Sequence, residues 1–257
     1  MLRERGAQVC NFGLDEGDAA VALRPERIVV AGGDGSVGPA AEAAARARVP
    51  LAVVPAGTAN DFARALDIPL NLAAACRLAV EGSATRLIDL GWMRHRPFVN
   101  VASIGLSPTA AVKGRGLKRI FGPLAYSIGA LRAGLGADPI RCRVSCDGQP
   151  LFDGRAWQAS VAVTGAFGGG ASLEADPHDG ELDVVVFEAA SRARLVVHAY
   201  GLRVGGVRSQ RGVRTGHGRA VEIRTDGTTR FNVDGELVKA DDARFRVAAK
   251  AFRVVHG

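Results

Sequence analysis

The stretch RIVVAGGDGSVGPAAEAAARAR, residues 27–48, decides how the first part of this chain is expected to fold. It begins with a β-branched apolar run, passes through a glycine cluster and continues in an alanine-rich segment typical of a helix. The same order recurs in PLAVVPAG, residues 50–57, which precedes the helix-like segments 60–66 and 71–82. Continuous apolar strands between amphipathic helices indicate a parallel sheet covered on both faces. We therefore predict a Rossmann-like α/β nucleotide-binding domain over residues 1–88.

The pattern changes after about residue 85, where short strand-like segments follow one another with Gly and Asp turns between them. The expected strands are 85–93, 96–106, 140–152, 157–170, 181–189, 219–227, 229–240 and 244–255, and the expected helices are 121–136 and 191–205. This pattern predicts a β-sandwich substrate or lid domain over residues 89–257, with its last segment returning to the first domain.

The amino-terminal end is expected to depart from a complete α/β domain. Residues 8–12 (QVCNF) are predicted to form a short strand and residues 15–23 a helix. Before them, residues 2–9 (LRERGAQV) look like the end of a helix that runs into this strand. Such a domain normally opens with a strand before that helix, and here this first strand is expected to be missing.

Composition excludes several classes of function. Lys and Arg number 33 against 26 Asp and Glu, a net charge of +7, while aromatic residues make up only 5%. Basic charge without interleaved aromatic residues argues against nucleic-acid binding. No apolar run approaches the ~18 residues of a membrane span, and no signal-peptide core is present, so a cytoplasmic protein is expected. The four cysteines lack zinc-type spacing and are expected to be reduced and mostly buried.

The glycine cluster has three interpretations. Residues 33–38 (GDGSVG) match a dinucleotide fingerprint, but no acid ends the next strand, and Asp34 would face a pyrophosphate directly. A P-loop requires a lysine after the glycines, and none follows. In the third interpretation, backbone N–H groups and a helix N-terminus hold phosphate while Asp34 acts through Mg²⁺ or a hydroxyl, with Pro39 in the first helical turn. From these residues alone, a tight turn capped by Asp34 is equally favoured.

A second loop, PAGTANDFARALDIP at residues 55–69, follows the next predicted strand. Gly57 permits a tight turn, Thr58 offers a hydroxyl, and Asn60 or Asp61 is suited to cap a helix that starts at Phe62. A capped helix after a loop would explain these residues structurally. Because both loops follow strands, however, both are expected at the carboxyl edge of the sheet, where α/β folds bind ligands.

Six motifs occur in an order that resembles the diacylglycerol kinase catalytic domain family, especially soluble bacterial lipid kinases. They are GGDGS (32–36), GTANDFAR (57–64), FVNVASIGL (98–106), GAFGGG (165–170), DPHDGELDVVVF (176–187) and NVDGEL (232–237). Sphingosine and ceramide kinases are similar, and NAD kinases are more distant. The resemblance implies transfer of the γ-phosphoryl group of ATP, with Mg²⁺, to the hydroxyl of a diacylglycerol-like lipid.

The same resemblance implies roles for individual residues. Those expected to bind nucleotide are Gly32, Gly33, Asp34, Gly35, Ser36, Gly57, Thr58, Asn60, Asp61 and Glu236, with Asp34 also organising Mg²⁺. Asp179 matches the aspartate proposed as general base, although on the residues alone HDGEL reads as a turn. Asp176 and His178 are neighbours that could share this role.

The chain departs from the family pattern at three places. Ser36 stands where threonine is usual, and Gly38-Pro39 stand where Asn-Glu is frequent. The family's first strand and its Asn-Pro…Ser-Gly loop are missing, for which an upstream start is the favoured explanation.

Partners follow from the implied substrate. The basic segment 113–119 beside apolar residues 120–136 is expected to hold the protein on an anionic membrane surface, with a solvated loop as the alternative. The basic run 203–219 is expected to serve solubility. A non-catalytic nucleotide- or lipid-binding homologue and a kinase for a soluble acceptor are the competing functions, and the sequence leaves a homodimer open.

Overall fold

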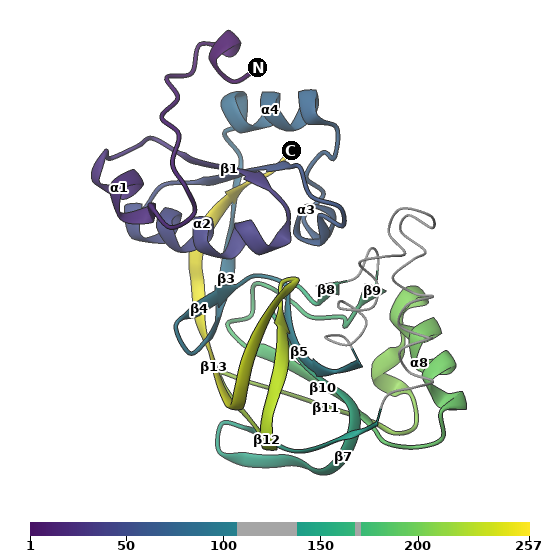
Figure 1. The fold of residues 1–257 in the computed structure, drawn as a ribbon. Coiled ribbons are helices and arrows are strands. Elements are labelled where there is room, and N and C mark those ends of the chain that lie inside the picture. The colour runs from purple at the N-terminus through teal and green to yellow at the C-terminus, as the bar shows by residue number, and fades with distance from the viewer. Residues whose placement is uncertain (107–137, 168–170) are drawn as a thin grey trace.

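The structure is a computed structural model that describes residues 1–106, 138–167 and 171–257. Figure 1 shows α1 to α4 gathered at one end of the molecule and the long strands at the other, with α8 beside the strands. The helices are η1 Arg3–Arg5, α1 Gly17–Ala22, α2 Asp34–Ala47, α3 Asp61–Ala65, α4 Leu72–Glu81, α8 Ala193–Val204 and η3 Val207–Ser209. The strands are β1 Ile28–Gly32, β2 Leu51–Pro55, β3 Thr85–Met93, β4 Arg96–Phe98, β5 Val101–Gly105, β6 Ile140–Cys146, β7 Gln149–Ala162, β8 Ala166–Phe167, β9 Ala171–Ser172, β10 Leu182–Glu188, β11 Val213–Gly218, β12 Ala220–Val233 and β13 Glu236–Val255.

The α/β part is built on two parallel strands covered on both faces. β1 and β2 pair in register from Ile28 opposite Leu51 to Gly32 opposite Pro55. Side chains of β2 alternate between two apolar clusters, because successive residues of a strand point to opposite faces. Leu51 and Val53 pack with α2, whereas Ala52 and Val54 pack with α4. The predicted α/β layout is confirmed.

The strand-rich part continues the same hydrogen-bonded sheet, whose order is β1-β2-β13-β12-β5-β7-β10-β11. Within this part the described neighbouring strands pair antiparallel. β13 is the longest strand; it pairs with β12 at its start and, after a bulge between Ala248 and Phe252, places Val254 beside Leu51 of β2. One strand therefore runs through both parts and holds them together, and the predicted β-rich second part is confirmed.

The prediction of a strand at residues 8–12 was wrong, because these residues form no strand. Most of their side chains are exposed, including Phe12 at 40%, so a strand here would have no layer to cover. In the described sheet β1 pairs with β2 alone. The expected helix that follows is present as α1.

The cysteines are free thiols, as expected from their spacing. Cys10 is exposed, and Cys76, Cys142 and Cys146 are buried. Burial raises the pKa of both Cys142 and Cys146 to about 11, which keeps these thiols protonated near neutral pH. Among the described residues, no helix has both the length and the hydropathy needed to cross a membrane. The basic segment 113–119 and the expected helix 121–136 lie outside the described residues.

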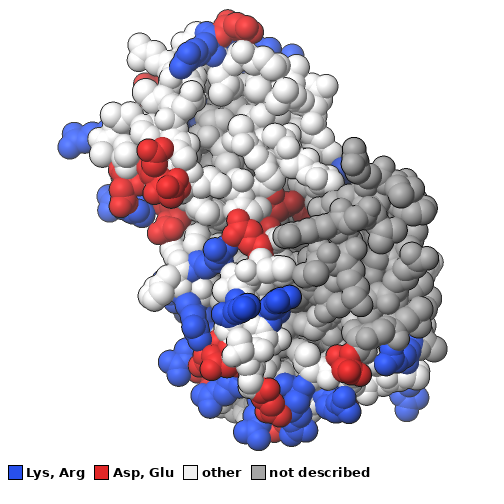
Figure 2. All heavy atoms as spheres, in the orientation of Figure 1, with Lys and Arg blue, Asp and Glu red and all other residues white. Residues whose placement is uncertain are grey.

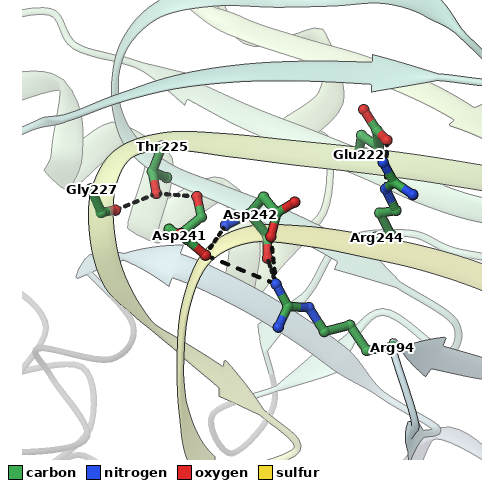
Figure 3. A network of polar contacts seen from close by, with 7 residues as sticks. All are labelled: Arg94, Glu222, Thr225, Gly227, Asp241, Asp242 and Arg244. Carbon is green, nitrogen blue, oxygen red and sulfur yellow. Dashed lines mark hydrogen bonds and ion pairs between the residues drawn. The ribbon is translucent and has the colours of Figure 1, made fainter.

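A polar network fixes the β12–β13 hairpin against the turn between β3 and β4 (Figure 3). Arg94, in that turn, makes an ion pair with Asp242 and also donates to the carbonyl oxygen of Asp242 at 2.9 Å. The Thr225 hydroxyl donates to the carbonyl oxygens of Gly227 and Asp241, both at 2.8 Å. Exposed ion pairs contribute little to stability, so the value of this network lies in holding β4 in place.

Candidate active site

The glycine cluster forms the first turn of helix α2. The helix begins at Asp34, within the glycine cluster, and Pro39 lies beyond its first turn, so the prediction of Pro39 in the first turn was wrong. The cause is Gly33, whose extended backbone (φ −94°, ψ −174°) turns the chain directly from β1 into the helix. The first N–H groups of a helix have no partner within it and carry partial positive charge. The motif residues therefore present an anion-binding end of α2.

The two predicted phosphate-binding loops are in direct contact. A Cβ placed on Gly57 would lie 2.4 Å from the Cα of Gly33, and the Ala56 N–H donates to the Gly32 carbonyl at 2.9 Å. Asn60 holds its own loop closed: its Oδ1 accepts from the Gly57 N–H at 2.9 Å, and its Nδ2 donates to the Gly57 carbonyl at 3.1 Å. The loops at 32–36 and 57–60 thus form one surface at the carboxyl edge of the sheet.

This contact predicts a large penalty for Gly57→Ala. The new methyl group would overlap the Gly33 backbone, and we expect the free energy of unfolding to fall by roughly 1–3 kcal/mol. The matched control is Gly17→Ala at the start of α1, where the nearest atom to the new methyl group is 3.8 Å away. Urea denaturation of both variants measures the effect. Equal stability of the two variants would show that the loops do not pack as described.

Asp34 joins the two loops to the strand-rich part. Its Oδ1 accepts from the Phe62 N–H of α3 at 2.9 Å and from Asn100 Nδ2 at 3.1 Å. Asn60, at the N-cap position of α3, makes no side-chain cap hydrogen bond, so Asp34 supplies the cap expected from Asn60 or Asp61. Within the described part of the chain, no hydrogen bond reaches Asp34 Oδ2. One carboxylate oxygen therefore has a structural role, and the other has no such role among the described residues.

A second polar layer lies behind Asp34. The Thr164 hydroxyl donates to Asn100 Oδ1 at 2.7 Å, and the Asp234 carboxylate accepts from the N–H groups of Val99 (2.7 Å), Asn100 (3.0 Å) and Val101 (3.0 Å). Asp234 and Gly235 form the two-residue turn between β12 and β13, both with positive φ, which favours an Asp-Gly pair. Sequence reasoning missed Asn100, Thr164 and Asp234 as site residues. For Asn100, the available signal was its position as a polar residue inside the apolar run FVNVASIG, residues 98–105.

The ionisation of Asp234 makes stability depend on pH. Burial raises the pKa of Asp234 from 3.8 to about 7; the charge of Asp34 adds to this, and the backbone N–H donors act in the opposite direction. Between these values the folded state binds more protons than the unfolded state, so its stability falls as pH rises.

We therefore expect the free energy of unfolding in Mg²⁺-free buffer to decrease as pH rises through about 7, and Asp234→Asn to flatten this decrease. Urea denaturation across that range measures both slopes. Asp147→Asn, in the exposed Asp-Gly turn between β6 and β7, is the matched control and is expected to keep the wild-type slope. A wild-type slope in Asp234→Asn would rule out this residue as the source.

Glu236 lies beside the first turn of α2, as its predicted place near the nucleotide requires. A Cβ on Gly35 would be 3.2 Å from Glu236 Oε1, and Arg96 of β4 makes an ion pair with Glu236. Figure 2 shows acidic atoms near the middle of this face, with Lys and Arg atoms below them over the strand-rich part. Arg96 thus offsets the negative charge that Glu236 brings to the N-terminal end of α2.

Asp179 lies on an exposed loop that is attached to β3, the strand that leads out of the α/β part. Its Oδ1 accepts from the Glu181 N–H at 2.9 Å, and the Asp176 carboxylate makes the same kind of turn with the His178 N–H at 3.0 Å. The fully buried Asp89 of β3 anchors the loop by accepting from the Gly180 N–H at 2.7 Å. Among the described residues, no hydrogen bond or ion pair joins Asp179 to the Asp34 network, so its role as base stays a prediction.

A shallow pocket lies at the junction of the two loops. Its lining comprises Gly32, Gly33, Asp34, Val37, Val53, Pro55, Asn60, Phe62 and Ala63. It has no room for a water molecule, so it is a depression between the loops and not a cavity that encloses a ligand. No group of three or more His, Cys, Asp or Glu suited to a metal occurs in the described ranges. A single carboxylate is still compatible with Mg²⁺, which is usually held by one or two carboxylates together with substrate phosphates.

Comparison with known proteins supports a kinase. A model of the diacylglycerol kinase catalytic domain matches residues 13–93, and one of the YegS C-terminal NAD kinase beta sandwich-like domain matches residues 100–256. Diacylglycerol kinases of Staphylococcus aureus strains JH9 and Newman are 30% identical over 233 residues, covering 86% of this chain and 71% of each relative. The chain belongs to the diacylglycerol kinase family.

Family membership supports phosphoryl transfer from ATP, and the fold agrees with it. A solved diacylglycerol kinase structure from Bacillus anthracis str. Sterne superimposes with a TM-score of 0.78 at 21% identity, covering 96% of this chain and 84% of that one. A second structure from the same organism gives 0.79 at 22% identity, covering 96% and 85%. Both likenesses concern the fold alone.

The structure brings some of the predicted nucleotide-binding residues into contact and leaves others apart. Gly57 lies against both Gly33 and Asn60, and Glu236 lies against Gly35 in the first turn of α2. Gly32 lies at the pocket, Asp61 is buried in the first turn of α3, and Thr58 is exposed in its loop. The Ser36 N–H donates to the Gly33 carbonyl at 2.9 Å, within the first turn of α2. Ligand contacts of these residues remain predictions.

Proposed function

We propose that this protein is an ATP- and Mg²⁺-dependent kinase that transfers a phosphoryl group to the hydroxyl of a diacylglycerol-like lipid. The observation that carries the proposal is the position of Asp34 in the first turn of α2. Its Oδ1 is committed to Phe62 and Asn100, while its Oδ2 accepts no hydrogen bond from the described residues. A carboxylate held in this way, at an anion-binding helix end, suits a metal-bridged phosphate better than a bare one.

The nucleotide phosphates would lie on the surface formed by the two glycine loops. Gly33, Gly35 and Gly57 leave room for phosphate oxygens to approach backbone N–H groups, since a side chain at any of these positions would occupy that space or force the loops apart. Asp34 Oδ2 would hold Mg²⁺, which when bound neutralises negative charge on the phosphates. Glu236, beside Gly35 and paired with Arg96, would face the same region from β13.

The lipid hydroxyl must lose its proton as its oxygen bonds to the γ-phosphorus and the bond from that phosphorus to ADP breaks. We assign the proton to the carboxylate of Asp179. Its loop is held by Asp89 on one side and by the contact of His178 Nδ1 with the Leu87 carbonyl, 2.7 Å, on the other. A base needs such support, because general-base catalysis depends on placing the acceptor within hydrogen-bond reach of the reacting hydroxyl.

The diacylglycerol acceptor is supported by the names of the Staphylococcus aureus relatives. An acceptor screen tests it: transfer of label from γ-labelled ATP to diacylglycerol, to sphingosine and to water-soluble alcohols, with and without mixed micelles. We expect labelled product only with lipid in micelles. Transfer to a soluble acceptor without micelles would replace the proposal with an NAD-kinase-like function, and ATP binding without transfer to any acceptor would leave a binding protein.

A further inference from the structure

Helix α8 has an apolar face that packs against none of the apolar clusters formed by the described residues. Val197, Tyr200 and Val204 are 55%, 67% and 61% exposed, and their spacing places them on one side of the helix. On the other side, Leu195 and Leu202 pack against the apolar cluster that contains Trp157 and Phe187. The helix is therefore seated through one face, and the outer face of α8 (Val197, Tyr200 and Val204) is available for contact.

The segment around α8 carries positive charge only. Residues 191–214 contain six arginines, at positions 192, 194, 203, 208, 211 and 214, and no Asp or Glu. Two of them are used within the domain, Arg208 with Asp183 and Arg214 with Glu188. Among the described residues, Arg194 and Arg211 make no ion pair. Residues 191–214 thus combine an exposed apolar stripe with two arginines that make no ion pair among the described residues, a composition that suits contact with an anionic lipid surface.

Helix α8 is connected to the candidate active site by a short two-stranded sheet. β9 contacts α8, and its partner β8 contacts α3, whose Phe62 N–H is bonded to Asp34. Figure 1 shows β8 and β9 between these two helices. A membrane held at α8 would therefore lie on the side of the molecule that leads to the phosphate-binding loops.

We propose that the outer face of α8 docks on an anionic membrane surface, with Val197, Tyr200 and Val204 entering the interface and Arg194 and Arg211 contacting lipid phosphates. This proposal rests on the proposed function, since a lipid acceptor requires access to a membrane. It gives part of the basic run 203–219 a role other than the solubility expected from the sequence. A second copy of this chain is disfavoured as the occupant, because a symmetric contact through α8 would place arginine against arginine.

Co-sedimentation with vesicles tests the surface in the absence of ATP. Wild-type protein is compared with Val197→Glu/Val204→Glu on phosphatidylcholine vesicles and on vesicles that also contain phosphatidylglycerol. Two charged residues in the interface are expected to lower the partition coefficient by about ten-fold or more. Leu72→Glu is the matched control; Leu72 is a 51% exposed residue at the start of α4 in the other part of the molecule, and its replacement is expected to change nothing.

A second variant, Arg194→Gln/Arg211→Gln, keeps the test decisive if the glutamates unfold α8. At ~1 kcal/mol for each basic residue near the surface, each arginine lost is expected to weaken binding to anionic vesicles about five-fold. Binding of both variants at the wild-type level would overturn the proposal. It would also be overturned if the protein were a dimer in solution and Val197→Glu/Val204→Glu made it a monomer without changing vesicle binding. Failure here is distinct from failure of the proposed function: micellar diacylglycerol would still be phosphorylated if only the docking surface were wrong.

Discussion

Asp34→Asn is expected to lower the rate of phosphoryl transfer by roughly 10²- to 10³-fold while leaving the fold intact. The asparagine oxygen keeps an acceptor for the Phe62 N–H and for Asn100 Nδ2, which Asp34 Oδ1 now binds. The negative charge that would hold Mg²⁺ is lost. Turnover as a function of Mg²⁺ concentration, together with thermal unfolding, measures the two effects separately.

Asp34→Ala is the comparison for the structural role of this side chain. It removes the hydrogen-bond acceptor as well as the charge, so the Phe62 N–H and Asn100 Nδ2 lose their bond to this side chain. Relative to Asp34→Asn, we expect an additional loss of about 1–3 kcal/mol in the free energy of unfolding. Full activity of the asparagine variant would mean that Asp34 is a cap for α3 and nothing more. Equal destabilisation of both variants would contradict the assignment of its two oxygens.

Asp179→Asn is expected to reduce turnover by about 10²- to 10⁴-fold and to leave ATP binding unchanged. The amide oxygen still accepts from the Glu181 N–H, so the turn is kept while the proton acceptor is removed. Turnover in mixed micelles and the dissociation constant of ATP, measured by calorimetry, check the two halves of this result.

The neighbouring Asp176 offers a control in the same loop. Its carboxylate accepts from the His178 N–H in an equivalent turn. Asp176→Asn therefore makes the same chemical change in the same loop, at a residue shortly before the proposed base. We expect this variant to retain most of its activity. A large loss in Asp176→Asn with little loss in Asp179→Asn would transfer the role of base to Asp176.

The sequence predicted those features that depend on local pattern. The apolar runs at β1 and β2 identified a covered parallel sheet, and the segment 85–93 coincides with β3. The glycine loops were placed at the carboxyl edge because both follow strands, and the structure brings Gly33 and Gly57 into contact there.

The sequence did not predict contacts that cross between elements. Asp34 was considered as a cap for its own turn, but it caps α3, 28 residues later, and binds Asn100, 66 residues later. Asp234 was not selected, because its three N–H partners come from a break between β4 and β5 that no local pattern marks. The start of α2 was placed too late, since glycines usually weaken a helix, whereas here they form its first turn.

The central claim is that this site transfers phosphate to a lipid, and one measurement tests it most directly. Purified protein is incubated with γ-labelled ATP and diacylglycerol in mixed micelles, and labelled phosphatidic acid is measured at increasing Mg²⁺ concentration. We predict product whose formation requires Mg²⁺ and is lost in Asp34→Asn. Binding of ATP with no labelled lipid at any Mg²⁺ concentration would contradict the account.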